Sequence, residues 1–167
     1  MLILTADDVR KALPMTEAIE AMKNAYASLS SGKAVVPLRM GLPIPESEAL
    51  SLFMPAYVHS AYGQALAIKV VSLFPDNPAR GLAYIQAAVL VFDPETGRAI
   101  ALLDGSSLTA IRTGAAGRAA LDSLARQDSK VAGVFAAGAP GRTQLDAACT
   151  ARQSATAFVY VSTVDKH

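Results

Sequence analysis

Apolar residues recur at helical spacing near the N-terminus of the chain. Thr5 is placed to cap a short helix that Pro14 ends, and a second helix begins at Thr16. The apolar positions of this second helix fall on one face of a 3.6-residue period: Ile19, Met22, Tyr26 and Leu29. Gly32 then follows as a fitting C-terminal cap. The chain is therefore predicted to open with two helices.

Between Val35 and Gly105 the pattern becomes that of β-strands. Pro37 and Pro43 confine the first strand, Val35–Leu42, to an edge or an irregular path. Three apolar runs follow, and a turn at residues 93–97 joins the last of them to a further strand: Leu50–Met54, Leu66–Phe74, Tyr84–Phe92 and Arg98–Leu103. This region predicts a mixed, largely antiparallel sheet with the N-terminal helices against it.

The last third of the chain has the order helix, strand, helix, strand. Ser107 or Thr109 is expected to cap a helix that reaches about Arg126, and residues 130–138, 140–152 and 156–161 read as one β-α-β unit. A nucleotide-binding sheet needs several such units, because each parallel strand must be paired on both sides and covered by helices. We therefore expect an α+β domain at residues 1–126, followed at residues 127–167 by the start of a Rossmann-type dinucleotide-binding domain that is truncated after one β-α-β unit.

Composition and charge narrow the classes of protein and partner. Hydrophobic residues make up 52% of the chain and charged residues only 17%, well below the roughly 25% charged of soluble domains. Such a surface predicts a partner, and we expect a homodimer. Lys and Arg number 15 against 14 Asp and Glu, so nucleic acid is an unexpected partner. The longest uncharged run, residues 82–92, is too short for a membrane span, and a single cysteine fits the cytoplasm.

Three cations stand out by their surroundings. Lys69 lies inside an apolar strand, where an unpaired ammonium would be costly unless its pKa falls or an anion meets it. Arg39 lies in the proline-flanked strand, and Arg112 lies near the start of a helix, where it gains most by facing a bound carboxylate. If the three converge, they form an anion clamp. From spacing alone, two surface arginines and a snorkelling lysine are the simpler interpretation.

A glycine turn follows the strand that begins at Lys130. The segment Ala136-Ala-Gly138-Ala-Pro-Gly141 keeps the second and third glycines of the fingerprint G-x-G-x-x-G and has alanine for the first. An acidic residue is expected at the end of the next strand, where Ser162 and Thr163 stand instead. This leaves NADP, or loss of binding, open beside NAD.

The remaining candidates favour structural roles. His59 is expected in an exposed loop, Cys149 in helix packing and His167 at the terminus. No two of them have metal-ligand spacing, so we expect no metal site. The sequence also contains no nucleophile motif.

Several of these segments together resemble one family. They are Leu102-Leu-Asp-Gly-Ser-Ser-Leu-Thr-Ala-Ile-Arg-Thr-Gly-Ala-Ala116, Phe53-Met-Pro-Ala56, Lys69 and the glycine turn ending in Arg142. The chain closely resembles the ornithine cyclodeaminase/mu-crystallin family over essentially its whole length. The resemblance implies a substrate and dimerisation domain followed by a nucleotide-binding domain, in proteins about twice as long. Its members handle small α-amino or α-imino acids with NAD(H) or NADP(H).

The resemblance also implies roles for individual residues. Arg39, Lys69 and Arg112 resemble the residues that hold the substrate carboxylate, Met54 lies with them in the substrate site, and Lys69 is placed to assist proton transfer. Residues of the Arg-Thr segment, of the glycine turn and of the end of the last strand are implied to bind the cofactor: Thr113, Gly138, Ala139, Pro140, Gly141, Arg142, Ser162 and Thr163.

Three departures from the family pattern shape the functional expectation. Leu52 stands where ornithine cyclodeaminases place a glutamate for the distal amine, which argues for a substrate without a second cation. The turn lacks its first glycine, and the family's catalytic aspartate belongs to a region beyond residue 167. We expect the N-terminal portion of an NAD(P)-dependent ketimine or pyrroline-carboxylate reductase, or of an alanine dehydrogenase, that is inactive as this chain alone and binds the cofactor weakly or not at all. The alternatives are ornithine cyclodeaminase proper and a non-catalytic mu-crystallin-like binding protein.

Overall fold

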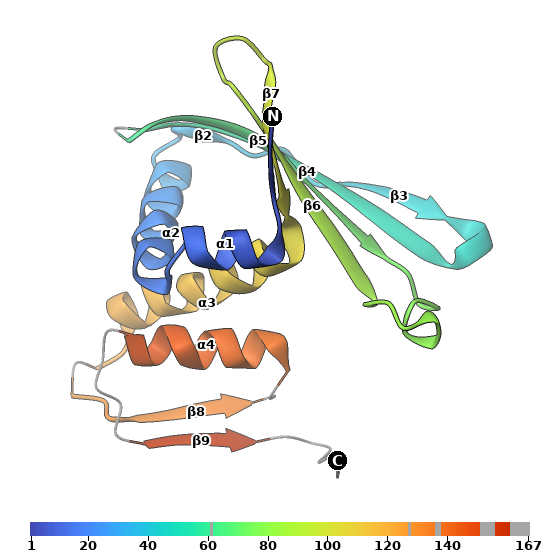
Figure 1. Cartoon of the computed structure of the whole chain (residues 1–167). Coiled ribbons are helices and arrows are strands. Elements are labelled where there is room, and N and C mark those ends of the chain that lie inside the picture. The colour runs from blue at the N-terminus through green and yellow to red at the C-terminus, as the bar shows by residue number, and fades with distance from the viewer. Residues whose placement is uncertain (61, 127, 136–137, 151–155, 161–167) are drawn as a thin grey trace. The chain divides into compact units, whose positions relative to one another are not determined.

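The computed structural model describes residues 1–60, 62–126, 128–135, 138–150 and 156–160, and the chain forms two compact units (Figure 1). The first unit comprises residues 1–11 and 25–108, and the second comprises residues 12–24 and 109–167. Within the described residues, no helix is long and apolar enough to cross a membrane. These units divide the chain differently from the expected boundary between residues 126 and 127, which stays a prediction about domain organisation.

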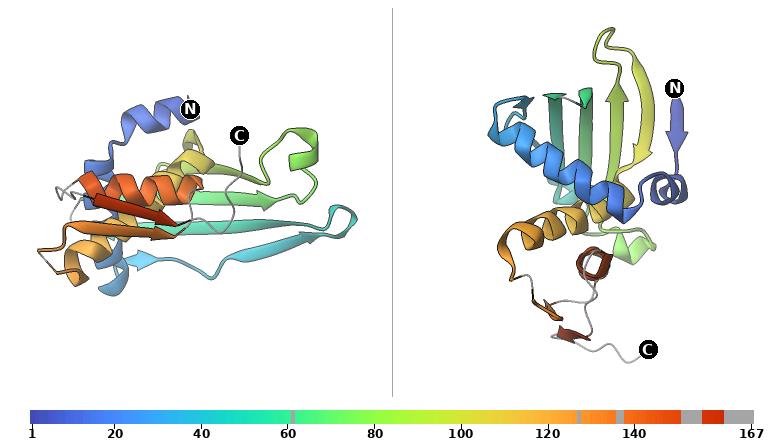
Figure 2. Two further views of the ribbon diagram at one scale, coloured as in Figure 1. Left: turned by 90° about the horizontal axis from the view of Figure 1, so that it is seen from below. Right: turned by 90° about the vertical axis from the view of Figure 1, so that its left-hand side faces the viewer.

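The first unit is built on one twisted sheet of seven strands (Figures 1 and 2). Its order is β1-β7-β6-β5-β4-β2, with β3 also paired to β4. Only the β1–β7 pairing is parallel, so the mixed and largely antiparallel sheet is confirmed. The strands are β1 Leu2–Leu4, β2 Ala34–Val35, β3 Met40–Ile44, β4 Ala49–Ser60, β5 Gly63–Leu73, β6 Ile85–Phe92 and β7 Ala99–Asp104.

The helices and the second, smaller sheet complete the described elements. Strands β8 and β9 pair in parallel, with α4 between them in sequence, which confirms the β-α-β unit. These elements are α1 Ala6–Ala12, α2 Met15–Ser30, α3 Gly105–Leu124, β8 Val131–Phe135, α4 Ala139–Thr150 and β9 Thr156–Tyr160, with short 3-10 turns η1 Pro45–Ser47 and η2 Pro78–Arg80.

Local signals place the start of α1 as predicted. The Asp8 amide donates to Thr5 Oγ1 at 3.4 Å, and the Thr5 amide donates back to Asp8 Oδ2 at 3.0 Å. This reciprocal capping satisfies two backbone donors that a helix start leaves free. The Thr5 hydroxyl also donates to the Asp8 carboxylate, and these hydrogen bonds lower the pKa of Asp8. The helix ends at Ala12, ahead of Pro14.

Several expected elements differ from the structure. The first strand is broken into β2 and β3, because Pro37 has no amide to donate, and Arg39 lies in the connection rather than in a strand. His59 is exposed but belongs to β4, not to a loop. The expected apolar face of α2 is only partly covered, since Ile19 is 4% exposed but Tyr26 is 48% exposed.

The start of α3 also differs from the expectation. Asp104 provides the cap, accepting the Ser107 amide at 2.7 Å, so neither Ser107 nor Thr109 does. The helix begins at Gly105, which puts Arg112 two turns inside it rather than at its start. A Cβ on Gly105 would lie 2.7 Å from backbone atoms of Ala87 and Ala88. The first turn of α3 can therefore meet β6 this closely only because residue 105 has no side chain.

We expect Gly105→Ala to lower the free energy of unfolding by about 1 to 3 kcal/mol, because the added methyl overlaps main-chain atoms that cannot rotate away. Urea denaturation measures the change. The control is Ser106→Ala, an exposed neighbour in the same turn, which should stay within about 0.5 kcal/mol of the unmodified protein. Equal stability of the two variants would contradict the close approach of α3 to β6.

Candidate functional site

Lys69 lies in the middle of the sheet. Its strand, β5, pairs with β4 from Leu50 to Ser60 without a shift, and this register sets Lys69 opposite Met54. On the other side, Lys69 is opposite Val89, which is 7% exposed. Directly opposed residues of an antiparallel pair share a face, so Met54, Lys69 and Val89 form one row. Lys69 itself is half-buried.

Arg39 reaches the same part of the sheet from the β2–β3 connection. It is exposed and comes directly before Met40, which is paired with Phe53, the neighbour of Met54. Leu52 lies two residues before Met54 on β4, so it shares the Lys69 face of the sheet. The first unit therefore brings together Met54, Lys69 and Leu52 on one face of the sheet, and it holds Arg39 in the connection that enters β3.

Arg112 and Thr113 belong to the second unit. Both are half-buried on α3. The Thr113 hydroxyl donates to the carbonyl of Thr109 at 2.6 Å, and the Thr113 carbonyl accepts the side-chain amide of Gln144 at 3.1 Å. Gln144 lies on α4, so the two predicted residues of α3 are joined to the helix that follows the glycine turn. Sequence reasoning missed Gln144, because only tertiary packing reveals its partner.

The glycine turn leads directly into α4. Gly138 is exposed, and its carbonyl accepts the Arg142 amide at 3.1 Å, within the first turn of the helix. Arg142 is exposed and Gly141 is half-buried. Ala139 and Pro140 begin α4, while Ala136, Ala137, Ser162 and Thr163 lie outside the described residues.

The start of α4 has features that suit an anion. The first amides of a helix lack intrahelical acceptors, and the helix dipole favours negative charge there. An exposed Gly138 lets the backbone approach a pyrophosphate, and Arg142 adds a charge beside it. The residues present therefore suit the pyrophosphate, which Gly138, Gly141 and Arg142 would hold.

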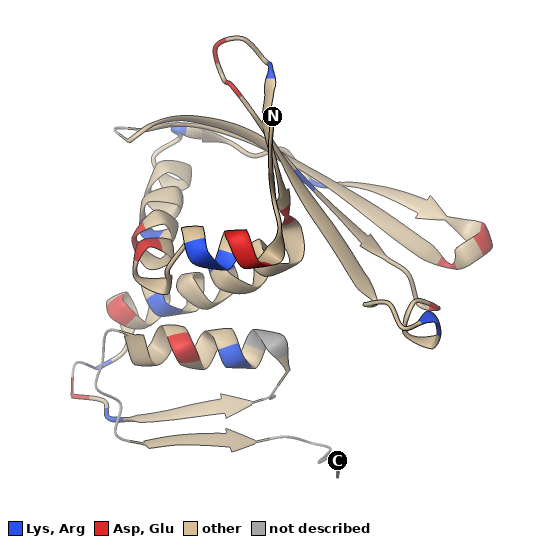
Figure 3. Ribbon diagram, in the orientation of Figure 1, with Lys and Arg blue, Asp and Glu red and all other residues tan. Residues whose placement is uncertain are grey.

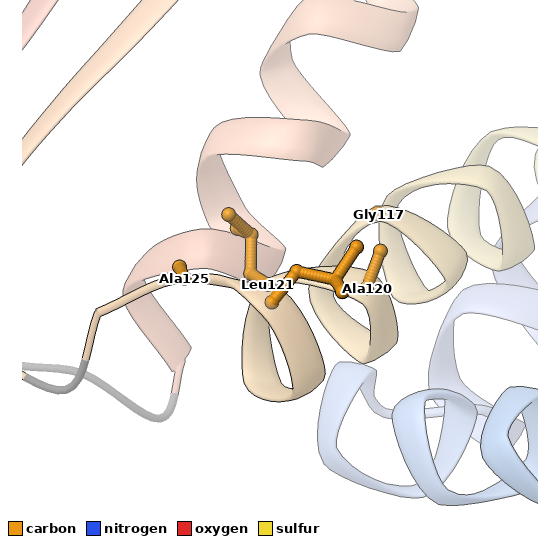
Figure 4. A pocket seen from close by; sticks show the side chains of 5 residues that line it. Gly117, Ala120, Leu121 and Ala125 are labelled. Carbon is orange, nitrogen blue, oxygen red and sulfur yellow. The ribbon is translucent and has the colours of Figure 1, made fainter.

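The other surfaces that the structure describes have few groups suited to catalysis or metal binding. An open hollow beside the C-terminal half of α3 has only apolar lining, from Gly117, Ala120, Leu121, Leu124 and Ala125, so it contains no group able to hold a proton (Figure 4). Among the described residues, most charged residues belong to helices and turns, and most of the sheet is uncharged (Figure 3). Cys149 is exposed and free. In the part of the chain that the structure describes, no three His, Cys, Asp or Glu side chains could hold a metal ion together.

Known proteins resemble this chain over nearly its whole length. It is 32% identical to a Δ1-pyrroline-2-carboxylate reductase of Bacillus cereus over 166 residues, which are 99% of this chain and 50% of the relative. The solved Δ1-pyrroline-2-carboxylate reductase of Thermococcus litoralis, in complex with NADH and L-proline, superposes with a TM-score of 0.86 at 43% identity, covering 98% of this chain and 50% of that one. An archaeal alanine dehydrogenase dimer with bound NAD gives 0.88 at 32% identity, covering 96% and 48%.

These relatives agree with the family that the motifs of the chain resemble. The chain spans about half the length of the relatives that it matches. The family model described as the ornithine cyclodeaminase/mu-crystallin family matches residues 1–166. The chain therefore belongs to the ornithine cyclodeaminase/mu-crystallin family.

Proposed function

We propose that the chain is the N-terminal portion of an NAD(P)-dependent oxidoreductase that acts on a small α-imino or α-amino acid, of the ketimine or pyrroline-carboxylate reductase or alanine dehydrogenase type. The observation that carries this proposal is Lys69, a half-buried cation in a largely uncharged sheet beside Met54. The activity is proposed for the whole protein. We also propose that the protein is located in the cytoplasm. Residues 1–126 would form the substrate and dimerisation domain, and residues 127–167 would begin the nucleotide domain.

In this proposal the cations hold the substrate by its carboxylate. Lys69 is opposite Met54 in the first unit and Arg39 comes directly before β3, and the resemblance adds Arg112 from the second unit. Fixing the carboxylate orients the substrate α-carbon, which lowers the entropic part of the barrier. Lys69 would also hold or release the proton on the substrate nitrogen. The bound dinucleotide would supply the chemistry of hydride transfer.

Leu52 favours a substrate with one charged nitrogen. It is half-buried on the Lys69 face, two residues before Met54. A second ammonium placed against this apolar side chain would lose its hydration without gaining a partner. This disfavours ornithine cyclodeaminase proper. The non-catalytic, mu-crystallin-like alternative keeps the carboxylate site and the dimer but not the reaction.

We also propose a homodimer formed through the Ile68 face of the sheet, the face opposite Lys69. The register aligns one uncharged apolar row on it across five strands: Ile3, Leu102, Leu90, Ile68 and Pro55. None of these residues is fully buried, and Ile3 is 69% exposed. A wide apolar surface of this kind is stabilised by a second copy that covers it.

The carboxylate site is tested by thermal denaturation with proline or pyruvate. A ligand present at ten times its Kd, and bound only to the folded protein, adds about 1.4 kcal/mol, or about 3 to 6 °C in Tm. Lys69→Met should abolish the shift and stay folded, because methionine keeps the apolar stem. Ornithine should shift the Tm less than proline does.

The matched control for this experiment is Lys33→Met, an exposed lysine on the same unit that should leave the shift unchanged. A well-folded protein whose Tm does not respond to any of these carboxylates would remove the basis for a substrate site at Lys69.

Titration with NADH and NADPH, followed by fluorescence, should show little binding below millimolar concentration. Among the described residues of the second unit, β8 and β9 are the only strands, and every residue of β9 is exposed. One β-α-β unit therefore offers a pyrophosphate turn without walls for the adenine and nicotinamide rings. Micromolar binding of either dinucleotide would show that the chain forms a complete pocket.

Sedimentation equilibrium should show a dimer at micromolar concentration, and Ile68→Lys should shift it to monomer by placing a charge in the apolar row. The control is Ala65→Lys, an exposed position of the same strand that points to the Lys69 face. Circular dichroism verifies that both variants fold. A monomeric unmodified chain, or a dimer that Ile68→Lys leaves intact, would rule out this interface.

A further inference from the structure

Two glycines of α3 let this helix pack closely against α4 in the second unit. A Cβ on Gly114 would overlap the main-chain carbonyl of Thr143 on α4, and a Cβ on Gly117 would overlap the side-chain amide of Gln144. Gly114 is buried and Gly117 is half-buried. The two helices therefore meet at Gly114 and Gly117 at a distance that leaves no room for a larger side chain.

A polar tether lies on each side of this glycine contact. Near its beginning, the Gln144 amide donates to the Thr113 carbonyl at 3.1 Å. Near its end, Arg118 Nη1 donates to the carbonyl of Ala148 at 2.8 Å. Ala148 lies in the last turn of α4, where carbonyls lack intrahelical donors and a positive charge is favoured. Each tether thus joins a side chain of one helix to the main chain of the other.

Arg118 is itself held in place by a charged network. It is 3% exposed, and its Nη2 donates to Asp122 Oδ1 at 2.8 Å, while Lys23 Nζ lies 3.1 Å from Oδ2. Burial alone would raise the pKa of Asp122, but the hydrogen bond from Lys23 and the charge of Arg118 outweigh it and lower the pKa. The carboxylate therefore stays ionised at neutral pH and fixes the guanidinium, although Arg118 Nε has no hydrogen-bond partner among the described residues.

The order of these contacts gives the direction of the two helices. Residues 143 and 144 meet α3 at residues 113–117, and residue 148 meets it at residue 118. The two helices run in the same direction, as Figure 1 also shows. Arg142, in the first turn of α4, therefore lies level with Arg112 and Thr113 of α3.

We propose that α3 and α4 form one rigid block and that Arg118 and Gln144 are its positioning residues. The block would fix Gly138 and Arg142, at the start of α4, relative to Arg112 and Thr113, so that the proposed cofactor-binding and substrate-binding residues keep one spacing. This inference rests on the proposed function for its consequence, whereas the rigidity of the block does not depend on any ligand.

Residual dipolar couplings of the backbone amides test the block directly. We compare the unmodified chain with Gln144→Met, Arg118→Met and the control Thr150→Ala, which removes a hydrogen bond inside α4 and none to α3. In the unmodified chain and in the control, α3 residues 109–124 and α4 should fit one alignment tensor. In either tether variant, the couplings of α4 should shrink relative to those of α3. Arg118 is buried, so if its variant does not fold, Gln144→Met alone decides.

A second measurement on the same samples adds millimolar NADH and follows the amides of Arg142 and Thr113. Both signals should shift in the unmodified chain and in the control, whereas the tether variants should keep the Arg142 shift and lose about half or more of the Thr113 shift. A variant that is less stable but still holds the two helices together would leave the ratio of the Thr113 shift to the Arg142 shift unchanged.

The outcomes separate the inference from the proposed function. Helix couplings that fit one tensor in the tether variants would overturn the block, and so would NADH shifts that fall equally at both residues. If NADH moves no amide of the unmodified chain, the proposed dinucleotide site fails and the positioning role fails with it. The couplings then still decide whether Arg118 and Gln144 hold the two helices together.

Discussion

One hydrogen-bond register, running from β4 through β7, decides which side chains of the first unit can meet. It pairs residues 50–60 with residues 63–73 and continues across β6 and β7. Because side chains alternate between the faces of a strand, a slip by one residue would carry Lys69 to the opposite face and away from Met54. The single register shift in this path, between Val91 and Phe92, lies beyond the Lys69 row and leaves that row intact.

The same register sets Lys69 and the uncharged Ile68 row on opposite faces of the sheet. One face of the sheet carries Lys69 and the other carries the uncharged row through Ile68, so the two faces have different chemistry although both are apolar. Charged residues make up 17% of the chain, and those that the structure describes lie mostly on helices and turns. Most strand residues are therefore uncharged, and Lys69 is a charged exception in the middle of the sheet, where the proposed substrate carboxylate would bind.

Much of the fold could be predicted because its signals are local. Thr5 caps α1, residues 93–97 form a turn in which the Asp93 carboxylate accepts two amides, and apolar runs locate β5 and β6. The strands that the sequence did not predict, or predicted too short, depend on distant partners. Strand β1 has only three residues and exists because β7 accepts it, and β4 continues past Pro55 because β5 pairs with it throughout.

The candidate site likewise contains residues that the sequence reveals and residues that only packing reveals. Lys69 stands out from its neighbours in the sequence, because a charge interrupts an apolar strand. The position of Arg39 outside a strand and the contacts of Arg118 and Gln144 follow from packing, which no spacing in the sequence reveals. Glycines in the interior of α3 would each cost about 1 kcal/mol in helix propensity. The tethers give back a similar amount, about 1 kcal/mol for the neutral bond and about 1.5 to 3 for the charged one. Gly114 and Gly117 thus weaken α3 as an isolated helix and become favourable only with α4 against it, so the two helices are stable as a pair.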